Sequence, residues 1–293
     1  MNEIQLHTLL DKAGRFIEEG RLLHAAQIYH RLIALVPSCH EPYLQLAHIY
    51  LEWKGYRKAE KLLLRGERAN PGNPHFLLMV ANLHMREQRF DHALSCYNRL
   101  KHFRLPQVHF NIGLAYLNLG KADQAEEALR IASTLDPHFP KVHELLGEIM
   151  LRREKFTDAA KELKRALRHD PYSILGHRLL GKAYSQMGNW ASAFNEFELA
   201  IDMDSQDARS WQHCGEALMR LGRFAEAEAY MKKALTLNPE SPEALVSLGY
   251  ICVELGHMKK ALEVFDSALR MKPGDSRVAN GKLLLRTHDK SSN

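Results

Sequence analysis

A pattern of 34 residues recurs along almost the whole chain. In register, the full repeats begin at residues 6, 40, 74, 106, 140, 174, 208 and 242, and a truncated ninth begins at 276. Seven of the eight full repeats have 34 residues, and the third has 32. Self-similarity at a fixed period is typical of stacked supersecondary units, which bury a continuous core only by packing on their neighbours. The sequence therefore predicts a solenoid and not a domain built around a single core.

Two positions of the repeat are occupied by small residues. Position 20 is alanine in all eight full repeats, whereas position 8 is alanine in the first three and glycine in the last five. Helices that pack about 8 to 10 Å apart leave little room where they cross. We therefore expect the two positions to meet, with position 8 on the first helix of a repeat and position 20 on the second.

Each repeat contains two stretches in which apolar residues follow a helical period. The first stretch ends in a turn such as Leu119-Gly120-Lys121, and the second runs to a proline at position 32 in six repeats. Glycine ends helices readily, and proline stops them. Because neither helix can bury its apolar face alone, the pattern predicts an all-α chain of stacked helix-turn-helix units.

This pattern, completed by a large residue at position 24, resembles that of the tetratricopeptide repeat family over residues 6–275. Repeats four to eight are similar to the family throughout, while repeats one to three lack glycine at position 8 and carry Leu32, Gly66 and Leu100 at position 27, where the family prefers alanine. The resemblance implies a right-handed superhelical solenoid whose first helices line a concave groove, chiefly through positions 2, 5, 9 and 12. Residues 1–293 would then form a single solenoid.

Three places depart from the period. Repeat three lacks the proline and is two residues short, which predicts a local kink between residues 105 and 106 within one continuous solenoid. In repeat six, Ser205 stands where proline is expected, and this should loosen a turn without breaking the stack. After Gly274, the truncated repeat predicts a C-terminal capping helix at about residues 276–288, followed by a disordered tail at 289–293.

Charge and composition exclude several classes of protein. Forty basic and 35 acidic residues give a net charge of +5 without a block of like charge, so nucleic-acid binding is not expected. The first residues carry acids and no long apolar run, and no stretch of 18 uncharged apolar residues occurs, so we expect a soluble, cytoplasmic protein without membrane insertion. The four cysteines have no CxxC spacing and suit small core positions.

The seventeen histidines form no recognisable metal or catalytic motif. His109, His143 and His177 share position 4 of successive repeats, so stacked helices would place the outer two about 20 Å apart, too far for bonds of about 2 Å to one zinc ion. We expect them to fill an interface position where a bulky residue is usual. Because HExxH, GxSxG and glycine-rich phosphate loops are also absent from the sequence, we expect no enzyme activity, cofactor or metal.

The groove positions implied by the resemblance change character halfway along the chain. In repeats two to four they are mainly apolar, and the predicted anchors are Leu44, Leu51, Leu78, Met85, Phe110, Leu114 and Leu117. The predicted polar contacts are Asn82, Asn111, Lys141, Arg178 and Lys182. An apolar strip of this length normally marks a binding or self-association surface. The alternative is that neighbouring first helices cover part of the strip themselves.

Part of a carboxylate clamp is also present. Some tetratricopeptide proteins hold a partner's C-terminal carboxylate with five polar residues at fixed positions. Asn82, Asn111 and Lys141 fall at three of those positions here, but Leu78 and Leu145 occupy the other two. A carboxylate is held tightly by converging charged donors, and one cation is too few, so we do not expect a working clamp.

We therefore expect a non-enzymatic scaffold or adaptor whose groove binds an apolar or amphipathic segment of a partner protein. Arg178 and Lys182, one helical turn apart, are an alternative anion site. Two other functions stay open. One is a self-assembling structural protein, a homo-oligomer in which a second copy covers the apolar half of the groove. The other is the recognition subunit of an enzyme whose catalytic chain is separate.

Overall fold

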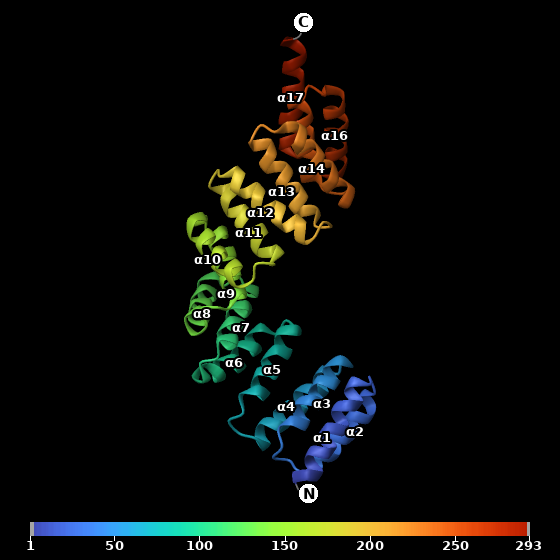
Figure 1. Cartoon of the computed structure of the whole chain (residues 1–293), viewed down its shortest axis with the longest axis vertical. Helices are drawn as coiled ribbons and strands as arrows, with labels where there is room; N and C mark the ends of the chain where they lie inside the picture. Colours follow the sequence, from blue (N-terminus) through green and yellow to red (C-terminus); the bar gives the residue numbers. More distant parts are fainter. Residues whose placement is uncertain (1–2, 292–293) are drawn as a thin grey trace. The chain divides into compact units, whose positions relative to one another are not determined.

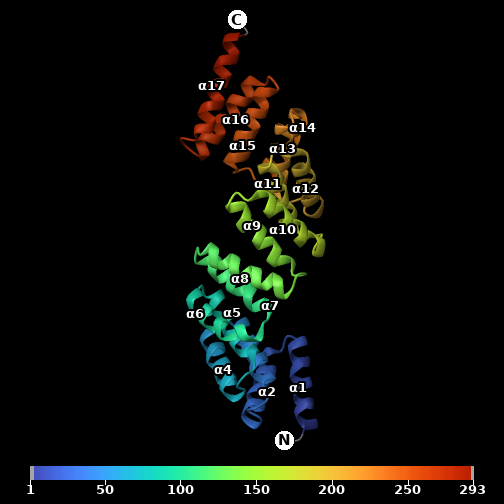
Figure 2. The same cartoon turned by 90° about the vertical axis from the view of Figure 1, so that its left-hand side faces the viewer.

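The computed structural model describes residues 3–291, which form seventeen α-helices and one short 3₁₀ helix and contain no β-strand. Packing divides the chain into two compact units, Met1–Pro137 and His138–Asn293. Within each unit the helices follow one another in chain order, as Figure 1 and Figure 2 show. The all-α helical-repeat fold predicted from the sequence is confirmed.

In its described part, the first compact unit contains eight α-helices. They are α1 (Glu3–Glu18), α2 (Leu22–Leu35), α3 (Glu41–Glu52), α4 (Tyr56–Ala69), α5 (Pro74–Arg86), α6 (Phe90–Leu100), α7 (Pro106–Asn118) and α8 (Ala122–Leu135), with the 3₁₀ helix η1 (Lys101–Phe103) between α6 and α7. Proline opens α5 and α7, at a position where its missing N–H breaks no hydrogen bond. Each helix packs against the next along the chain.

The second compact unit contains nine α-helices among its described residues. They are α9 (Pro140–Arg152), α10 (Phe156–His169), α11 (Ile174–Gln186), α12 (Trp190–Met203), α13 (Ala208–Arg220), α14 (Phe224–Leu237), α15 (Pro242–Glu254), α16 (Met258–Met271) and α17 (Ser276–Ser291). From repeat two onward, the first helix of every repeat begins within one residue of the start predicted from the period.

One residue in the turn between the two helices of each repeat has a left-handed backbone. It is glycine in five repeats, with φ between 72° and 76°. In the other three it is Lys54, Gln88 or Glu154, with φ between 56° and 59°. Glycine adopts this conformation freely, whereas a side chain there costs about 1 kcal/mol. The turn geometry is therefore kept in all eight repeats even where glycine is lost.

The glycine at position 8 makes room for a large side chain. A Cβ added to Gly181 would lie 2.5 Å from Cε1 of Phe197, and one added to Gly147 would lie 2.5 Å from Cγ of Leu163. Phe197 and Leu163 both stand at position 24 and are fully buried. Positions 8 and 20 do approach one another, since a Cβ added to Gly113 or Gly215 would lie 3.4 Å from the carbonyl oxygen of Ala125 or Ala227 at position 20. The nearest side chain in repeats four to eight is nevertheless the large residue at position 24.

The short end of repeat three forms η1 in place of a proline-containing turn. Arg104 follows with φ of 50°, and Leu105 leads into α7. This junction lies inside the first compact unit, whereas the boundary between the units follows Pro137. A single continuous solenoid over residues 1–293 stays a prediction.

The final helix covers the end of the second unit. On α17, Val278 is buried, and Gly281 lies against the ring of Phe265 on α16. The helix continues to Ser291, three residues beyond the predicted end, because residues 282–291 contain neither glycine nor proline. Disorder of the tail at 289–293 stays a prediction, and residues 292–293 lie outside the described residues.

Candidate functional site

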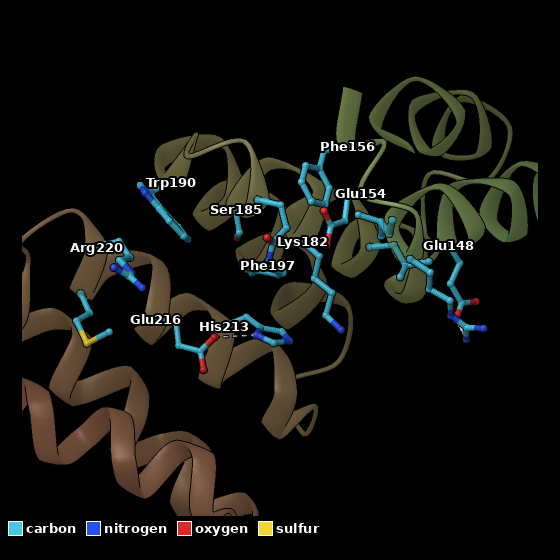
Figure 3. A pocket seen from close by; sticks show the side chains of 15 residues that line it. Glu148, Glu154, Phe156, Lys182, Ser185, Trp190, Phe197, His213, Glu216 and Arg220 are labelled. Atoms are coloured by element: carbon cyan, nitrogen blue, oxygen red, sulfur yellow. Dashed lines mark hydrogen bonds and ion pairs between the residues drawn. The ribbon is translucent and has the colours of Figure 1, made fainter. Parts of the chain in front are cut away.

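A pocket of about 650 Å³ lies along the first helices of repeats five to seven, within the second compact unit (Figure 3). The first helices supply Glu148, Leu151 and Arg152 from α9, Leu179, Lys182, Ser185 and Gln186 from α11, and His213, Glu216, Met219 and Arg220 from α13. Glu154, in the turn before α10, and Phe156, Trp190 and Phe197 of the second helices complete the wall.

The lining residues recur at the same positions of the repeat. Positions 6, 9, 12 and 13 of the first helices and position 17 of the second helices supply most of them. Positions 9 and 12 were expected in the groove, and Lys182 is the predicted contact that lines this pocket. Positions 6, 13 and 17 were missed, although position 17 carries a signal. It is aromatic in five of the eight repeats, as Tyr56, Phe90, Phe156, Trp190 and Phe224.

One wall of the pocket combines an arginine with an aromatic ring. The guanidinium carbon of Arg220, at position 13, lies 5.5 Å from the centre of the Trp190 ring, within the range of a cation–π contact. The same arrangement recurs in the first compact unit, where Arg86 lies 5.8 Å from the Tyr56 ring. Positions 13 and 17 of successive repeats therefore form a recurring contact.

Two of the three carboxylates of the pocket, Glu148 and Glu216, have polar partners within the pocket. Arg152 donates to Glu148 at 2.7 Å, and the His213 ring lies 3.2 Å from Glu216. Burial acts to raise the pKa of Glu216, but hydrogen bonds from His213 and Gln212 lower it below its ordinary value, so this group is ionised. Among the described residues, Lys182 makes no ion pair within 4.0 Å. Its charge nevertheless contributes to the lowered pKa of Glu216, so the two groups interact without a direct contact.

In repeats five to seven, the side chain at position 5, a position expected in the groove, contacts the beginning of the next repeat. This side chain hydrogen-bonds the residue that caps the first helix 29 residues later. The pairs are Glu144 with Ser173, Arg178 with Asp207, and Gln212 with Ser241. Arg178 is therefore neutralised by Asp207, and it does not line the pocket that Lys182 lines. Lys141 is exposed on the first turn of α9.

The two predicted asparagines lie together in the first compact unit. Nδ2 of Asn111 donates to Oδ1 of Asn82 at 3.1 Å, and the hydroxyl of Tyr97 donates to the same oxygen at 2.6 Å. Nε2 of Gln107 donates to Oδ1 of Asn111 at 3.1 Å. Much of the hydrogen-bonding capacity of these amides is thus used between repeats three and four.

The seven predicted apolar anchors are covered to different extents. Phe110 is buried, with 8% of its surface exposed. The others are half-buried, and they are Leu44, Leu51, Leu78, Met85, Leu114 and Leu117. Leu44 packs on the core of the first repeats, and Leu78 and Met85 pack on the core of repeats three and four. As the alternative interpretation anticipated, neighbouring helices cover part of this strip.

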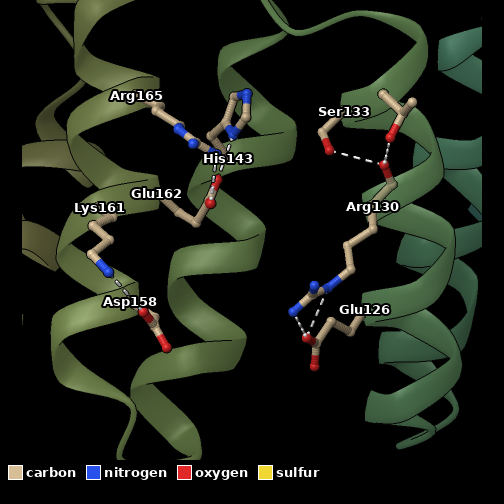
Figure 4. A network of polar contacts seen from close by, with 9 residues as sticks. Glu126, Arg130, Ser133, His143, Asp158, Lys161, Glu162 and Arg165 are labelled. Carbon is tan, nitrogen blue, oxygen red and sulfur yellow. Dashed lines mark hydrogen bonds and ion pairs between the residues drawn. The ribbon is translucent and has the colours of Figure 1, made fainter.

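Two of the three position-4 histidines pair with a glutamate on the second helix of their own repeat. Nδ1 of His143 lies 2.7 Å from Oε2 of Glu162, and Nδ1 of His177 lies 2.8 Å from Oε2 of Glu196 (Figure 4 shows the first pair). The hydrogen bond to Glu196 raises the pKa of His177. Among the side chains that the structure describes, no group of three or more histidine, cysteine or acidic residues is arranged to hold a metal ion.

The paired helices, the shared turn and the lined pocket define a helical-repeat protein of the kind whose curved surface binds other molecules. A sequence model described as "Tetratricopeptide repeat" matches residues 110–174, 178–235 and 214–276, which together make up more than half of the chain. The chain belongs to the tetratricopeptide repeat family, whose repeats form a protein–protein interaction fold.

Solved structures with the same fold are related only distantly in sequence. A tetratricopeptide repeat protein from Parabacteroides merdae is 17% identical, with a TM-score of 0.58 over 84% of this chain and 98% of its own. YrrB, titled "a TPR protein with an unusual peptide-binding site", is 17% identical, with a TM-score of 0.57 over 64% of this chain and 97% of its own. A chain of the APC/C hetero-tetramer Cut9-Hcn1 is 16% identical, with a TM-score of 0.60 over 98% of this chain and 57% of its own.

The sequence matches no curated protein. Across the described part of the chain, no helix has both the length and the apolar composition that a membrane span requires.

Proposed function

We propose that this chain is a non-enzymatic scaffold that binds a peptide segment of a partner protein in the pocket of repeats five to seven. The observation that carries the proposal is the pocket itself, which combines about 650 Å³ of space with three aromatic side chains and with Lys182, a cation that makes no direct ion pair among the described residues. Peptide sites are typically concave and mostly apolar, with a few placed polar groups that fix orientation. The hydroxyl of Ser185, which also lines the pocket, donates to the carbonyl of Gly181 on its own helix at 2.9 Å.

The chemistry of the pocket selects the kind of segment. Trp190 and Phe156 offer apolar faces to a bulky side chain of the peptide. Lys182 acts on Glu216 through its charge but makes no ion pair within 4.0 Å among the described residues, so an acidic side chain next to that bulky residue would gain a charge-assisted hydrogen bond. We therefore propose a ligand segment in which an acidic residue adjoins an aromatic or large aliphatic one.

Two of the similar structures support the class of ligand. YrrB carries a peptide-binding site according to its title, and Cut9-Hcn1 is a protein assembly. Because these chains share 17% and 16% identity with this one, the likeness concerns the fold. The argument for the pocket rests on the side chains of this chain.

The half-buried apolar side chains of repeats two to four are proposed as secondary contacts. Leu78 keeps part of its surface accessible, whereas Phe110 would have to move to meet a ligand. Replacing Phe110 by a charged residue is therefore a poor test of binding, since burying the charge would also destabilise the fold. Leu78→Gln is the cleaner probe of this surface, with unfolding in urea as the control for stability.

The test is selection of peptides from a random displayed library on the purified protein, followed by hydrogen exchange of the complex. The proposal expects enrichment of acidic residues beside aromatic or aliphatic ones, with slowed exchange in α11 and α13. Protection confined to α3, α5 and α7 would place the site in the first compact unit instead. Light scattering over a range of protein concentrations separates the homo-oligomer alternative, which predicts a mass that rises with concentration above 33.6 kDa.

A further inference from the structure

The histidine of repeat four lacks the partner that its two counterparts have. In repeats five and six a glutamate at position 23 meets Nδ1 of the histidine at position 4. In repeat four that position is Ala128, and Nδ1 of His109 is buried without a hydrogen-bond partner. A buried polar atom of this kind is uncommon. Repeat four therefore retains the histidine but lacks the carboxylate.

Burial determines the protonation state of the His109 ring. His109 is 7% exposed, and burial, with Lys101 as a second cause, lowers the pKa of the ring so that it is neutral at pH 7. An orphaned buried N–H is rarer than an orphaned acceptor, which puts the proton on Nε2 and leaves Nδ1 as an unprotonated lone pair. Since Nδ1 is enclosed, Nε2–H is the donor that a ligand can reach.

The same ring lines a pocket of about 350 Å³ in the first compact unit. The pocket lies where repeat three is two residues short, and Arg104, with its left-handed backbone, forms part of its wall. The remaining lining comes from α8 and comprises Glu127, Arg130, Ile131, Thr134 and Leu135. An apolar wall and two guanidinium groups thus share one small space with an unsatisfied imidazole.

The charges around the pocket favour a singly charged anion. Nε and Nη2 of Arg130 donate to Oε1 of Glu126 at 3.0 and 2.5 Å, which leaves Nη1 for a further acceptor (Figure 4). Arg104 is exposed and makes no ion pair within 4.0 Å among the described residues. Glu127, also at the wall, would oppose a second negative charge on the ligand. A carboxylate therefore suits the site better than a phosphate dianion.

We propose that the pocket of His109, Arg104 and Arg130 binds a carboxylate carried on a short apolar stem. The two guanidinium groups and Nε2–H of His109 donate to the carboxylate oxygens, and the stem lies against Ile131 and Leu135. The site is separate from the pocket of repeats five to seven and does not depend on the function proposed for it. The carboxylate can come from a free aliphatic acid or from an acidic side chain of a peptide.

The experiment follows the imidazole signal of His109 by NMR in histidine-labelled protein, with His109→Gln to assign it. Hexanoate is the free-acid probe, and acetyl-Ala-Glu-Ala-amide is the peptide probe. Hexylamine, of equal length and opposite charge, is the control. The proposal expects saturable shifts with at least one carboxylate and none with hexylamine. Because a bound anion stabilises the imidazolium form, the pKa of His109 should rise on saturation.

Two variants make the test specific. Ala128→Glu installs the carboxylate that repeats five and six carry, and it should weaken binding, because it draws the proton of the neutral ring to Nδ1 and adds a negative charge beside the site. Arg104→Gln, at an exposed position, should weaken binding about tenfold, in line with the loss of one charge-assisted hydrogen bond. A response to hexanoate alone or to the peptide alone supports the proposal and names the source. No saturable shift with either probe, or equal affinity in wild type and Arg104→Gln, would overturn it.

Discussion

Arg178 on α11 donates through Nη1 to Oδ2 of Asp207, the residue that caps α13, at 2.9 Å. Oδ1 of Asp207 accepts the amide of Arg209, and Oδ2 also accepts the hydroxyl of Ser210. The carboxylate of Asp207 thus caps the first helix of repeat seven and also neutralises Arg178 on the first helix of repeat six. The equivalent links at Glu144 and Gln212 make this a repeated device for joining neighbouring repeats.

Removing this carboxylate should destabilise the second compact unit. Asp207→Ala loses an N-cap and leaves Arg178 unpaired, and we expect a loss of about 1 to 3 kcal/mol. A double-mutant cycle with Arg178→Ala, followed by urea unfolding, should give a positive coupling energy. Arg209→Ala is the matched control on the same turn. Its side chain is exposed, so the expected change stays within about 0.5 kcal/mol. Additive effects of the two single variants would show that the contact is not energetically coupled.

The same group predicts a dependence of stability on acid pH. Burial acts to raise the pKa of Asp207, but the hydrogen bonds from Ser210, Arg178 and the Arg209 amide lower it below the ordinary value of 3.8. Its contribution is therefore present above pH 3.8 and is lost as the pH falls through the lower pKa of the folded state. Unfolding free energies of wild type and Asp207→Asn should converge in that range. A gap that stays constant down to pH 2 would contradict the assignment.

His177 and His109 should contribute to the stability of the fold with opposite dependences on pH. The hydrogen bond to Glu196 raises the pKa of His177, so its stabilising effect is full below the ordinary value of 6.5 and is lost as the pH rises through its folded pKa. Burial lowers the pKa of His109, so stability is lost there as the pH falls below 6.5. Relative to wild type, His177→Gln should therefore be most destabilised near pH 5.5 and His109→Gln near pH 8. Equal profiles for the two variants would refute this difference.

Two glycines at position 8 give a matched test of packing. In Gly181→Ala the new methyl group would meet the buried ring of Phe197, and we expect a loss of about 1 to 3 kcal/mol. In Gly215→Ala the nearest atom is Cε of Met231, at 2.9 Å, the flexible end of its side chain. That variant should lose less stability. Thermal unfolding of both variants compares them directly, and equal losses would mean that the partner at position 24 does not set the cost.

The sequence predicted the fold well because the fold is local. Each 34-residue repeat carries its own turn and helix stops, so the first helices from α3 to α15 start where the period places them. The contact of position 8 with position 24 was not predicted, because the sequence shows which positions are small but not which side chain fills the space between them. The contact between Gly181 and Phe197 depends on the direction of a side chain from the facing helix.

The candidate site was only partly predictable. Lys182, one of the predicted groove residues, lines the pocket, whereas Arg178, one turn away, contacts the helix cap Asp207, 29 residues later. Which of the two side chains lines the pocket depends on how neighbouring repeats stack, and the sequence of a single repeat does not show this. The recurring aromatic residue at position 17 was visible in the sequence, and it would have pointed to Trp190. The role of Trp190 depends on Arg220 of the next repeat, whose guanidinium lies over the ring.

The most direct test of the account is the affinity of one library-selected peptide for three variants, measured by isothermal titration. Trp190→Ala should weaken binding at least tenfold, as truncation of a buried aromatic contact usually does, and Lys182→Glu should do the same by reversing the available charge. Tyr56→Ala removes the aromatic residue at the same position of repeat two, and it should leave the affinity within about twofold. Unchanged binding by Trp190→Ala and Lys182→Glu, with the fold intact, would contradict the proposal that this pocket holds the peptide.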